Sequence, residues 1–458
     1  MEIKKLLKQL GFTPLDRQEK EIALWKSYFQ GNVEKFHSYT EYQGAELGSV
    51  ERKRKTLGMP KVISELWADN IINPETKIVV QGENEEDTHL QEWWDDLNET
   101  LGIEMNLNDL MELSFALGTG ATVQSVEKNG QVIQQYINIE HIYPLKQDLK
   151  EIVDCAFVSV EPNEIYIQVH LKQENGSYLI LNRYFDKEGE PIEKEGVEEE
   201  VTSEVKLFQL YKPAIVNNIN IGSPLGISIF ANALDESKSI DITYDGIDKE
   251  VRNGRTRVYV RGSAIYTNKG NKYPIFNKDQ DEFYVLPEDE EADNGKDPVT
   301  VKQGSFNTDP LITALEKHIN LMGSKCGLGD NAFYAKDGTI YTNTEQVVSS
   351  NSKFYKTRQK HATRIEKSLV DMVKALFYLD TGQILDANVY VDFDDSIIHD
   401  TEAEYNRSRL EVMQGLKSNV QHFMDVMGLT QEEAENYWKL QLKHMALKPD
   451  VEEEGGEV

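Results

Sequence analysis

The clearest structural signal in this sequence lies between Pro224 and Gly254, which read PLGISIFANALDESKSIDITYDGIDKEVRNG. We expect one helix from about Ser228 to Asn253, because apolar residues recur at spacings of four, three and four and form a single stripe. That stripe contains Ile240, Tyr244, Ile247 and Val251. Asn253-Gly254 is a typical helix end, since glycine readily adopts the backbone conformation that closes a helix.

A second, acidic stripe lies on a neighbouring face of the same predicted helix. Asp241, Asp245 and Asp248 are spaced four and three, so their side chains point to one side. A charged stripe of this kind is usually a solvated helix face. Lys249 and Arg252 stand on the same helix and are placed to pair with it.

The chain beyond this helix predicts alternating strands and helices. Residues 255–306 indicate short strands with polar loops, and Pro310 suits the first turn of a helix from Asp309 to Met322. The Gly- and Asn-rich segment 327–344 indicates a loop. After it we expect a long helix, a strand, and a last helix that begins with a capping box. The long helix runs from Thr344 to Tyr378, and its apolar seam consists of Ile365, Leu369, Met372 and Leu376. The strand runs from Asn388 to Phe393, and Thr430 and Glu433 form the capping box.

The chain before this helix predicts helices followed by antiparallel strands. The first 120 residues indicate mainly helices, including Leu57 to Ile71 and Leu110 to Leu117, the latter capped by Asn106 or Asn108. Asn129-Gly130 favours a tight turn in a hairpin over 121–137. The alternation of apolar and polar residues over 153–184 predicts further strands. The Glu-rich segment 186–206 indicates a solvated hairpin tip or a loop. The pattern is that of an α+β protein.

Composition excludes several classes of protein. The chain has 458 residues with 49 Lys plus Arg and 79 Asp plus Glu, which gives a formal net charge of −30. A hydrophobic content of 39% argues against general disorder, and the acidity argues against binding nucleic acid through a broad basic face. Only Cys155 and Cys326 are cysteines, which favours a reducing compartment. No apolar run of 18 residues and no signal-peptide pattern occur, so we expect no membrane span and a protein of the cytoplasm or of a particle assembled there.

Motifs for nucleotide, metal or nucleophilic chemistry are missing from the sequence. Gly295-Lys296-Asp297 lacks the remaining residues of a phosphate-binding loop, and Gly327-Leu328-Gly329 lacks the third glycine of a dinucleotide fingerprint. The nine histidines are scattered, and the two cysteines are too far apart for a zinc motif. We therefore expect no cofactor and no resident metal.

One acidic motif does resemble a catalytic one. Asp392-Phe393-Asp394-Asp395 follows a predicted strand, as does the D-x-D motif of haloacid-dehalogenase-type phosphatases. Such an enzyme needs a parallel sheet and further catalytic residues downstream, and the remaining residues indicate helices.

Two basic clusters also stand out, Arg52 to Lys55 and Arg252 to Arg261. Each is interpreted either as an exposed surface face or as a local contact to phosphate or to a partner.

Five segments together resemble the phage portal proteins, in particular the subgroup from tailed phages of Gram-positive bacteria. They occur in the expected order over about residues 55–405, and their joint order makes the resemblance specific. The segments are Leu57 to Asp69, Gly222 to Asp245, Gly254 to Val260, Thr344 to Ser352 and Asp392 to Ala403.

This resemblance implies an α+β portal fold, with a mainly helical wing and crown, a two-helix stem and a small β-rich clip. It also implies assembly as a ring, usually of twelve subunits, at one vertex of the capsid. The divisions expected along this chain are an N-terminal wing part over 1–227, a first stem helix over 228–254, a clip over 255–306, a second stem helix over 307–326, a tunnel-loop region over 327–344, the long wing helix and strand over 345–400, and a crown with an acidic tail over 401–458.

The implied function is that of a non-enzymatic head–tail connector. Double-stranded DNA is packaged and ejected through the channel of such a ring. The implied partners are that DNA, the terminase large subunit, head–tail connector proteins, and capsid and scaffolding proteins, with no membrane. The expected location is the portal vertex of the virion, after assembly in the cytoplasm of a bacterial host.

The same resemblance suggests where the functional residues lie. An acidic channel wall repels phosphates over about 8–10 Å at physiological salt and lets DNA slide, whereas a basic wall would hold it. The DNA-channel candidates are Asp241, Asp245, Asp248, Lys249 and Arg252; the basic cluster at the base of the clip is Arg255, Arg257 and Arg261; the tunnel-loop region contains Gly327, Gly329, Asp330, Asn331, Lys336 and Gly338.

Two alternatives compete with the portal hypothesis. The first is another capsid or connector subunit, which would bind protein without forming a DNA channel. The second is a Mg²⁺-dependent phosphatase at Asp392 and Asp394.

Overall fold

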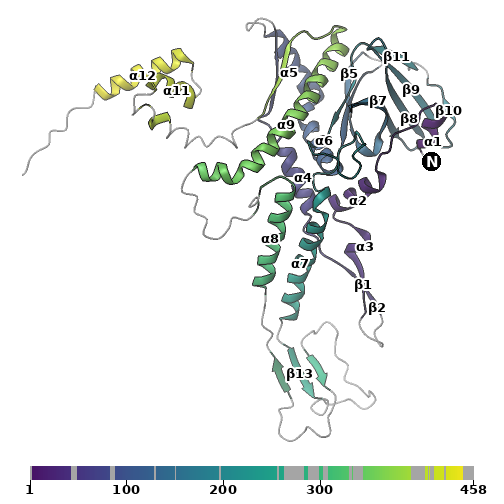
Figure 1. Ribbon diagram of the computed structural model, residues 1–458, viewed down its shortest axis with the longest axis vertical. Coiled ribbons are helices and arrows are strands. Elements are labelled where there is room, and N and C mark those ends of the chain that lie inside the picture. Colours follow the sequence, from purple (N-terminus) through teal and green to yellow (C-terminus); the bar gives the residue numbers. More distant parts are fainter. Residues whose placement is uncertain are drawn as a thin grey trace, which may run out of the picture.

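The molecule consists of a mixed α+β body and a long projection made of two helices, with a small sheet at the far end (Figure 1). The α+β prediction is confirmed. This computed structural model describes residues 3–42, 49–82, 88–127, 130–149, 151–194, 198–254, 257–261, 283–286, 299–302, 308–329, 333, 344–393, 408–410, 412, 417–427 and 430–446.

The helices of the body come mainly from the N-terminal part, as predicted. They are α1 (Ile3–Gln9), α2 (Glu19–Phe29), α3 (Glu34–His37), α4 (Met59–Asp69), α5 (His89–Leu101) and α6 (Ile103–Leu117). The expected cap of α6 at Asn106 or Asn108 is wrong, because the helix already begins after Gly102, whose φ of 57° terminates α5. Asn108 instead donates to the carbonyl of Ile72 at 2.6 Å.

The two larger sheets of the body are antiparallel, and each was expected in part. The hairpin predicted over 121–137 is β4 (Gly120–Val126) with β5 (Val132–Asn138), and β12 (Phe208–Tyr211) pairs with the other edge of β4. The larger sheet contains β6 (Ile142–Asp148), β7 (Glu151–Val160), β8 (Glu164–Lys172), β9 (Tyr178–Asp186), β10 (Pro191–Ile192) and β11 (Glu200–Ser203). Both β10 and β11 pair with β9, so much of the Glu-rich segment is an edge hairpin.

The projection begins with α7 (Leu234–Asn253) and returns through α8 (Asp309–Lys325). The expected start near Ser228 is six residues early. The backbone N–H of Ile229 donates to the carbonyl of Phe115 at 2.8 Å, and this link to α6 keeps the preceding residues out of the helix. Three short strands lie beyond the helices: β13 (Arg257–Arg261) pairs parallel with β14 (Phe283–Leu286) and antiparallel with β15 (Val299–Lys302).

The long helix α9 (Thr344–Thr381) crosses the body, and its predicted seam is confirmed (Figure 1). Ile365, Leu369, Met372 and Leu376 are each at most 2% exposed. Strand β16 (Asn388–Asp392) pairs antiparallel with β3 (Lys77–Gln81). Helices α11 (Asn419–Met427) and α12 (Gln431–Ala446) pack together, and the capping box of Thr430 and Glu433 is present at the start of α12.

One tryptophan joins the body to the projection. Trp67 is completely buried, and its ring lies 6.1 Å from that of Phe115 and 4.8 Å from that of His361. Its indole N–H donates to the carbonyl of Cys326, at the end of α8, at 3.0 Å. Helices α4, α6, α8 and α9 therefore meet at this side chain, and the root of the projection is fixed in the main core.

Candidate functional site

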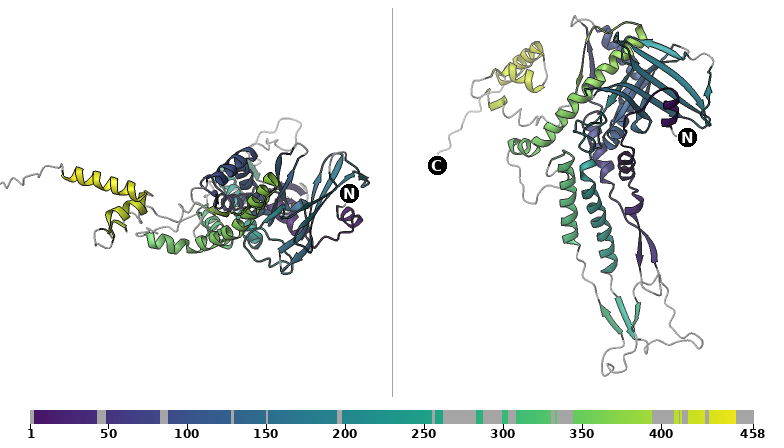
Figure 2. Two further views of the ribbon diagram at one scale, coloured as in Figure 1. Left: turned by 90° about the horizontal axis from the view of Figure 1, so that it is seen from above. Right: turned by 45° about the vertical axis from the view of Figure 1, so that its right-hand side comes forward.

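The acidic side of α7 lies against an N-terminal segment made of α3, the hairpin of β1 (Ser38–Tyr42) with β2 (Ser49–Lys53), and the residues before α4. This hairpin runs alongside α7 (Figure 2). Asp241 is only 3% exposed. Its carboxylate accepts hydrogen bonds from the backbone N–H of Leu57 at 2.8 Å and from the Thr56 hydroxyl at 3.0 Å. Burial with several donors is the usual environment of a structural carboxylate.

His37 completes this buried cluster. Its Nε2 lies 3.0 Å from Oδ2 of Asp241, and its Nδ1 accepts the backbone N–H of Val33 at 2.8 Å. A ring nitrogen that accepts a hydrogen bond carries no proton, so the hydrogen-bond network places the proton of the neutral ring on Nε2. Burial, and then the carboxylates of Asp235 and Asp241, raise the pKa of the nearby Tyr28 to about 12. The phenol therefore stays neutral beside them.

A second, more exposed set of contacts continues along α7. Asp245 is 7% exposed, accepts the backbone N–H of Lys55 at 3.3 Å and forms an ion pair with Lys249 at 3.0 Å. Lys249 also donates to the Tyr39 hydroxyl at 2.8 Å, and these two partners raise the pKa of its ammonium. The side chain of Lys55 pairs with Asp248 at 2.9 Å.

Arg54 stiffens the hairpin that makes these contacts. Its guanidinium carbon lies 4.3 Å from the ring centre of Phe36 and 5.0 Å from that of Tyr39, and it donates to the carbonyl of Phe36 at 2.8 Å. The basic run Arg52 to Lys55 therefore supplies contacts within the chain, at least through Arg54 and Lys55.

These contacts correct the prediction for the acidic stripe. Asp241 and Asp245 are buried under the N-terminal segment, so they form neither a solvated face nor a wall that DNA could touch within this chain. The side chain of Asp248 is 32% exposed and that of Lys249 51%, so these two remain candidates for a channel surface. Arg252 lies in α7, but its side chain is outside the described residues.

The outer faces of α7 and α8 carry exposed aliphatic side chains. Ile242 and Val251 on α7 are 52% and 45% exposed, and Ile312 and Leu321 on α8 are 43% and 48% exposed. Of the predicted stripe, Ile240 is completely buried inside the chain, whereas Val251 faces solvent. The projection therefore presents apolar surface on helices that are otherwise polar.

The loop predicted after α8 begins as a tightly docked helix end. Gly327 and Gly329 have φ values of 88° and 99°. A Cβ on Gly327 would lie 2.7 Å from the Thr357 side chain on α9, so glycine is needed there. Asp330, Asn331, Lys336 and Gly338 lie outside the described residues.

The other predicted basic cluster is described only in its backbone. Arg257 and Arg261 are the first and last residues of β13, whose side chains are not described, and Arg255 lies outside the described residues. Their role as a cluster remains a prediction.

The phosphatase-like motif does not have the surroundings that its chemistry needs. Asp392 ends β16, which pairs antiparallel with β3 and faces Lys77, rather than belonging to a parallel sheet. Asp394 and Asp395 lie outside the described residues. Within the described part of the chain, no group of three or more His, Cys, Asp or Glu is arranged to hold a metal ion.

His37 and Thr56 are the important residues that the sequence did not single out. Nothing in the spacing around His37 distinguishes it from the other histidines. Thr56 directly precedes the segment Leu57 to Asp69, whose resemblance to portal proteins was the only available signal.

A sequence model of the family described as "Phage portal protein, SPP1 Gp6-like" matches residues 14–436. The chain therefore belongs to this family of phage portal proteins, which is a family of structural proteins, and a portal or head–tail connector function follows from that membership.

Solved structures that match this chain include chains of gene transfer agent particles. One chain of the virion of the native particle is 10% identical, with a TM-score of 0.43 over 89% of this chain and 99% of that chain. A chain of the neck of the native particle, computed with C12 symmetry, is 11% identical, with a TM-score of 0.41 over 81% and 90%. A chain of the neck of the empty particle, computed with C6 symmetry, is 12% identical, with a TM-score of 0.44 over 88% and 98%.

Two further comparisons are negative. No curated protein matches the sequence. Among the described helices, none has the length and apolar character that crossing a membrane requires.

Proposed function

We propose that this chain forms the portal ring through which double-stranded DNA enters and leaves a phage capsid. The observation that carries the proposal is the projection of α7 and α8 from the body, ending in the sheet of β13, β14 and β15 (Figure 1). In a ring, such a projection is the stem that surrounds a channel, and the small sheet is the clip. Family membership supports the same assignment.

The remaining parts of the chain fit the other divisions of a portal subunit. The body up to residue 227 and the segment with α9 and β16 form the wing. Residues 327–344 form the tunnel-loop region, and the segment with α11 and α12 forms the crown. The clip receives the terminase large subunit during packaging and head–tail connector proteins afterwards.

The stem suits a ring in which neighbouring copies touch along α7 and α8. Exposed aliphatic side chains cost free energy in water, roughly 25 cal/mol for each Å² of apolar surface left uncovered. An adjacent stem that covers these side chains removes this free-energy cost for Ile242, Val251, Ile312 and Leu321.

The channel function does not need a nucleotide site in this chain, because the packaging motor supplies the energy. The net charge of −30 disfavours tight binding of DNA, and the exposed Asp248 and Lys249 give the stem a mixed surface. This combination suits a channel along which DNA slides. The protein works at the portal vertex of the virion after assembly in the host cytoplasm.

Electron microscopy of the purified full-length chain tests the proposal. Rings with a central hole, usually of twelve subunits, are expected, with scaffolding protein added where assembly requires it. Monomers or a closed lattice under both conditions favour another capsid or connector subunit without a channel.

A further inference from the structure

A rigid loop between β12 and α7 presents aliphatic side chains to solvent. Val216 and Ile221 are 69% and 71% exposed. The loop beneath them is well fixed, because the buried Asn217 side chain accepts the backbone N–H groups of Ile219 and Asn220 and donates to the carbonyl of Leu225. Their exposure is thus a property of an ordered surface, and such patches mark interaction sites.

Leu149 extends this apolar patch from the tip of the β6–β7 hairpin. It is 95% exposed and has a φ of 45°, a left-handed backbone conformation that is costly for leucine. One contact joins the hairpin to the loop that carries the patch, since Gln147 donates to the carbonyl of Gly222 at 3.4 Å. A second contact joins the hairpin to α9, where Glu151 pairs with Lys367 at 2.7 Å. A strained, fully exposed leucine is poorly explained by folding alone and well explained by a partner.

Cationic groups surround a cavity of about 560 Å³ beside these residues. Lys212, Lys360 and Arg364 line it, and none of its described lining residues is Asp or Glu. Burial, and then the charge of Arg364, lower the pKa of Lys212 to about 8, so a carboxylate arriving at the cavity would relieve unfavourable charge. A cavity lined by three cationic side chains is unusual in a chain whose net charge is −30. The lining residues Lys212, Lys360, Arg364, Val216 and Ile221, together with Leu149 at the tip of the β6–β7 hairpin, are called the basic surface.

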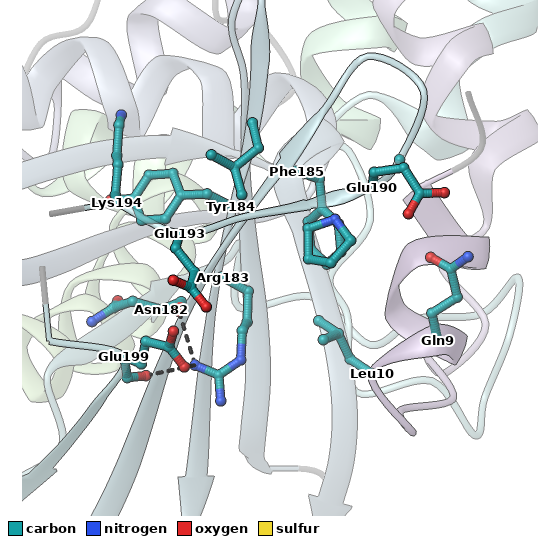
Figure 3. Close-up of a pocket in the computed structure, with 13 residues that line it drawn as sticks. Gln9, Leu10, Asn182, Arg183, Tyr184, Phe185, Glu190, Glu193, Lys194 and Glu199 are labelled. Atoms are coloured by element: carbon teal, nitrogen blue, oxygen red, sulfur yellow. Dashed lines mark hydrogen bonds and ion pairs between the residues drawn. The ribbon is translucent and has the colours of Figure 1, made fainter.

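The opposite end of the same sheet has the complementary chemistry. Val160 ends β7 and is 56% exposed, and Ile192 in β10 is 38% exposed. The register places Val160 in one row with Pro191, since Val160 pairs with Ile165, which pairs with Phe185, which pairs with Pro191. Ile192 follows Pro191 and lies on the opposite face of the same sheet end. The exposed carboxylates of Glu161, Glu190 and Glu193 accompany them. Val160, Ile192, Glu161, Glu190 and Glu193 are called the acidic sheet end, and Figure 3 shows Glu190 and Glu193 there beside a cavity of about 400 Å³.

The length of β7 separates the two surfaces. Leu149 lies just before the strand and Val160 is its last residue, so ten residues at about 3.3 Å each put roughly 30 Å between them. A closed ring uses two different, complementary patches on opposite sides of every subunit. Two patches with aliphatic side chains and opposite charge, at the two ends of one strand, meet this requirement.

We infer that the basic surface of one copy binds the acidic sheet end of the next copy in the ring. This inference rests on the proposed portal function and identifies the surfaces through which neighbouring wings touch. Leu149 and Ile221 supply apolar contacts to Val160 and Ile192, while Lys360 and Arg364 face the glutamates. Opposite charges select this head-to-tail pairing over like-with-like contacts.

Charge reversal on each surface, alone and together, tests the inference in the full-length chain. One double variant carries Lys360→Glu and Arg364→Glu, and a second carries Glu161→Lys and Glu193→Lys. Each is expected to reduce the fraction of rings by at least about tenfold in native mass spectrometry. The chain with all four changes restores opposite charges at every contact and is expected to recover the rings. Lys356→Glu, on the same helix but outside the cavity lining, is the matched control and should assemble normally.

A second variant protects the test against loss of folding. Leu149→Asn puts a residue that tolerates the left-handed conformation at an exposed position, so the monomer should melt at an unchanged or higher temperature. Ring formation should nevertheless fall. Unchanged rings in the charge variants and in Leu149→Asn, or no recovery in the fourfold variant, would overturn the inference. Absence of rings in the wild-type chain would instead count against the proposed function itself.

Discussion

His37 Nε2 and Asp241 Oδ2 lie 3.0 Å apart, although 204 residues separate them in the sequence. This hydrogen bond joins the N-terminal segment to the middle of helix α7. The same carboxylate accepts hydrogen bonds from the Thr56 hydroxyl and the Leu57 backbone N–H, so one buried aspartate ties α7 to the N-terminal segment. Its role is structural, and the consequences can be measured.

Asp241→Ala is expected to lower the free energy of unfolding by about 3 kcal/mol, because it leaves the buried donors of His37, Thr56 and Leu57 without their acceptor. Urea unfolding measures the change. Asp235→Ala is the control on the same helix: the side chain of Asp235 is 90% exposed, so its loss should cost less than about 0.5 kcal/mol. Equal effects of the two substitutions would contradict the buried-cluster assignment.

The outer ion pair between Lys55 and Asp248 is expected to contribute less than about 1 kcal/mol, because both side chains are partly exposed. A double-mutant cycle with Lys55→Ala and Asp248→Ala measures the coupling. That coupling should shrink further at 1 M salt, where the Debye length is about 3 Å, whereas the effect of Asp241→Ala should persist. A coupling as large and as salt-resistant as that of a buried pair would show that the hairpin covers this pair more completely.

A close approach of two backbones at the root of the projection requires glycine. Gly118 has a φ of 92°, and a Cβ there would lie 2.8 Å from the carbonyl oxygen of Gly226. Gly176 has almost the same φ, 91°, but a Cβ added there would meet no atom within 4 Å. Gly118→Ala should therefore destabilise the protein by about 1–3 kcal/mol more than Gly176→Ala, since only the former adds overpacking to strain. Equal losses would mean that the backbone conformation alone sets the cost.

Acid should destabilise the protein through buried His170. Burial lowers the pKa of this histidine from 6.5 to about 3, and neither ring nitrogen has a hydrogen-bond partner among the described residues. As pH falls below 6.5, the unfolded chain binds the proton first, so stability is complete above pH 6.5 and is lost between 6.5 and 3. At pH 5 the loss from this one group is about 2 kcal/mol.

His170→Phe tests the acid effect directly. The ring packs edge-on against Phe157 and Phe208, a setting that suits another aromatic side chain. The variant should lose about 2 kcal/mol less than the wild type between pH 7 and pH 5 in urea unfolding. Parallel pH dependence of the two proteins would show that His170 does not titrate in this way.

The sequence predicted the elements of the fold better than their partners. Periodicity located α7, α8, α9 and the strands β7, β8 and β9 of the larger sheet, because these patterns depend on local spacing. The same periodicity suggested that Asp241 and Asp245 form a solvated face, which is wrong because both side chains are buried. Which face of a helix is covered depends here on a segment far away in the chain, and one sequence does not contain that information.

The candidate site was predictable only in part for the same reason. Lys55 was recognised in a basic run and Asp248 in an acidic stripe, but their ion pair was not predicted, because the two patterns lie far apart in the sequence. His37 had no local pattern at all. The start of α7 was placed too early because the hydrogen bond from Ile229 to Phe115 is a tertiary contact.

The most direct test of the central claim is a cryo-electron microscopy reconstruction of the assembled, DNA-filled particle. The portal assignment predicts one ring of this chain at a single capsid vertex, with α7 and α8 bordering the DNA and β13 to β15 at the outer end of the channel. A chain distributed over the whole shell, or a ring whose DNA path is bordered by other elements, would contradict it.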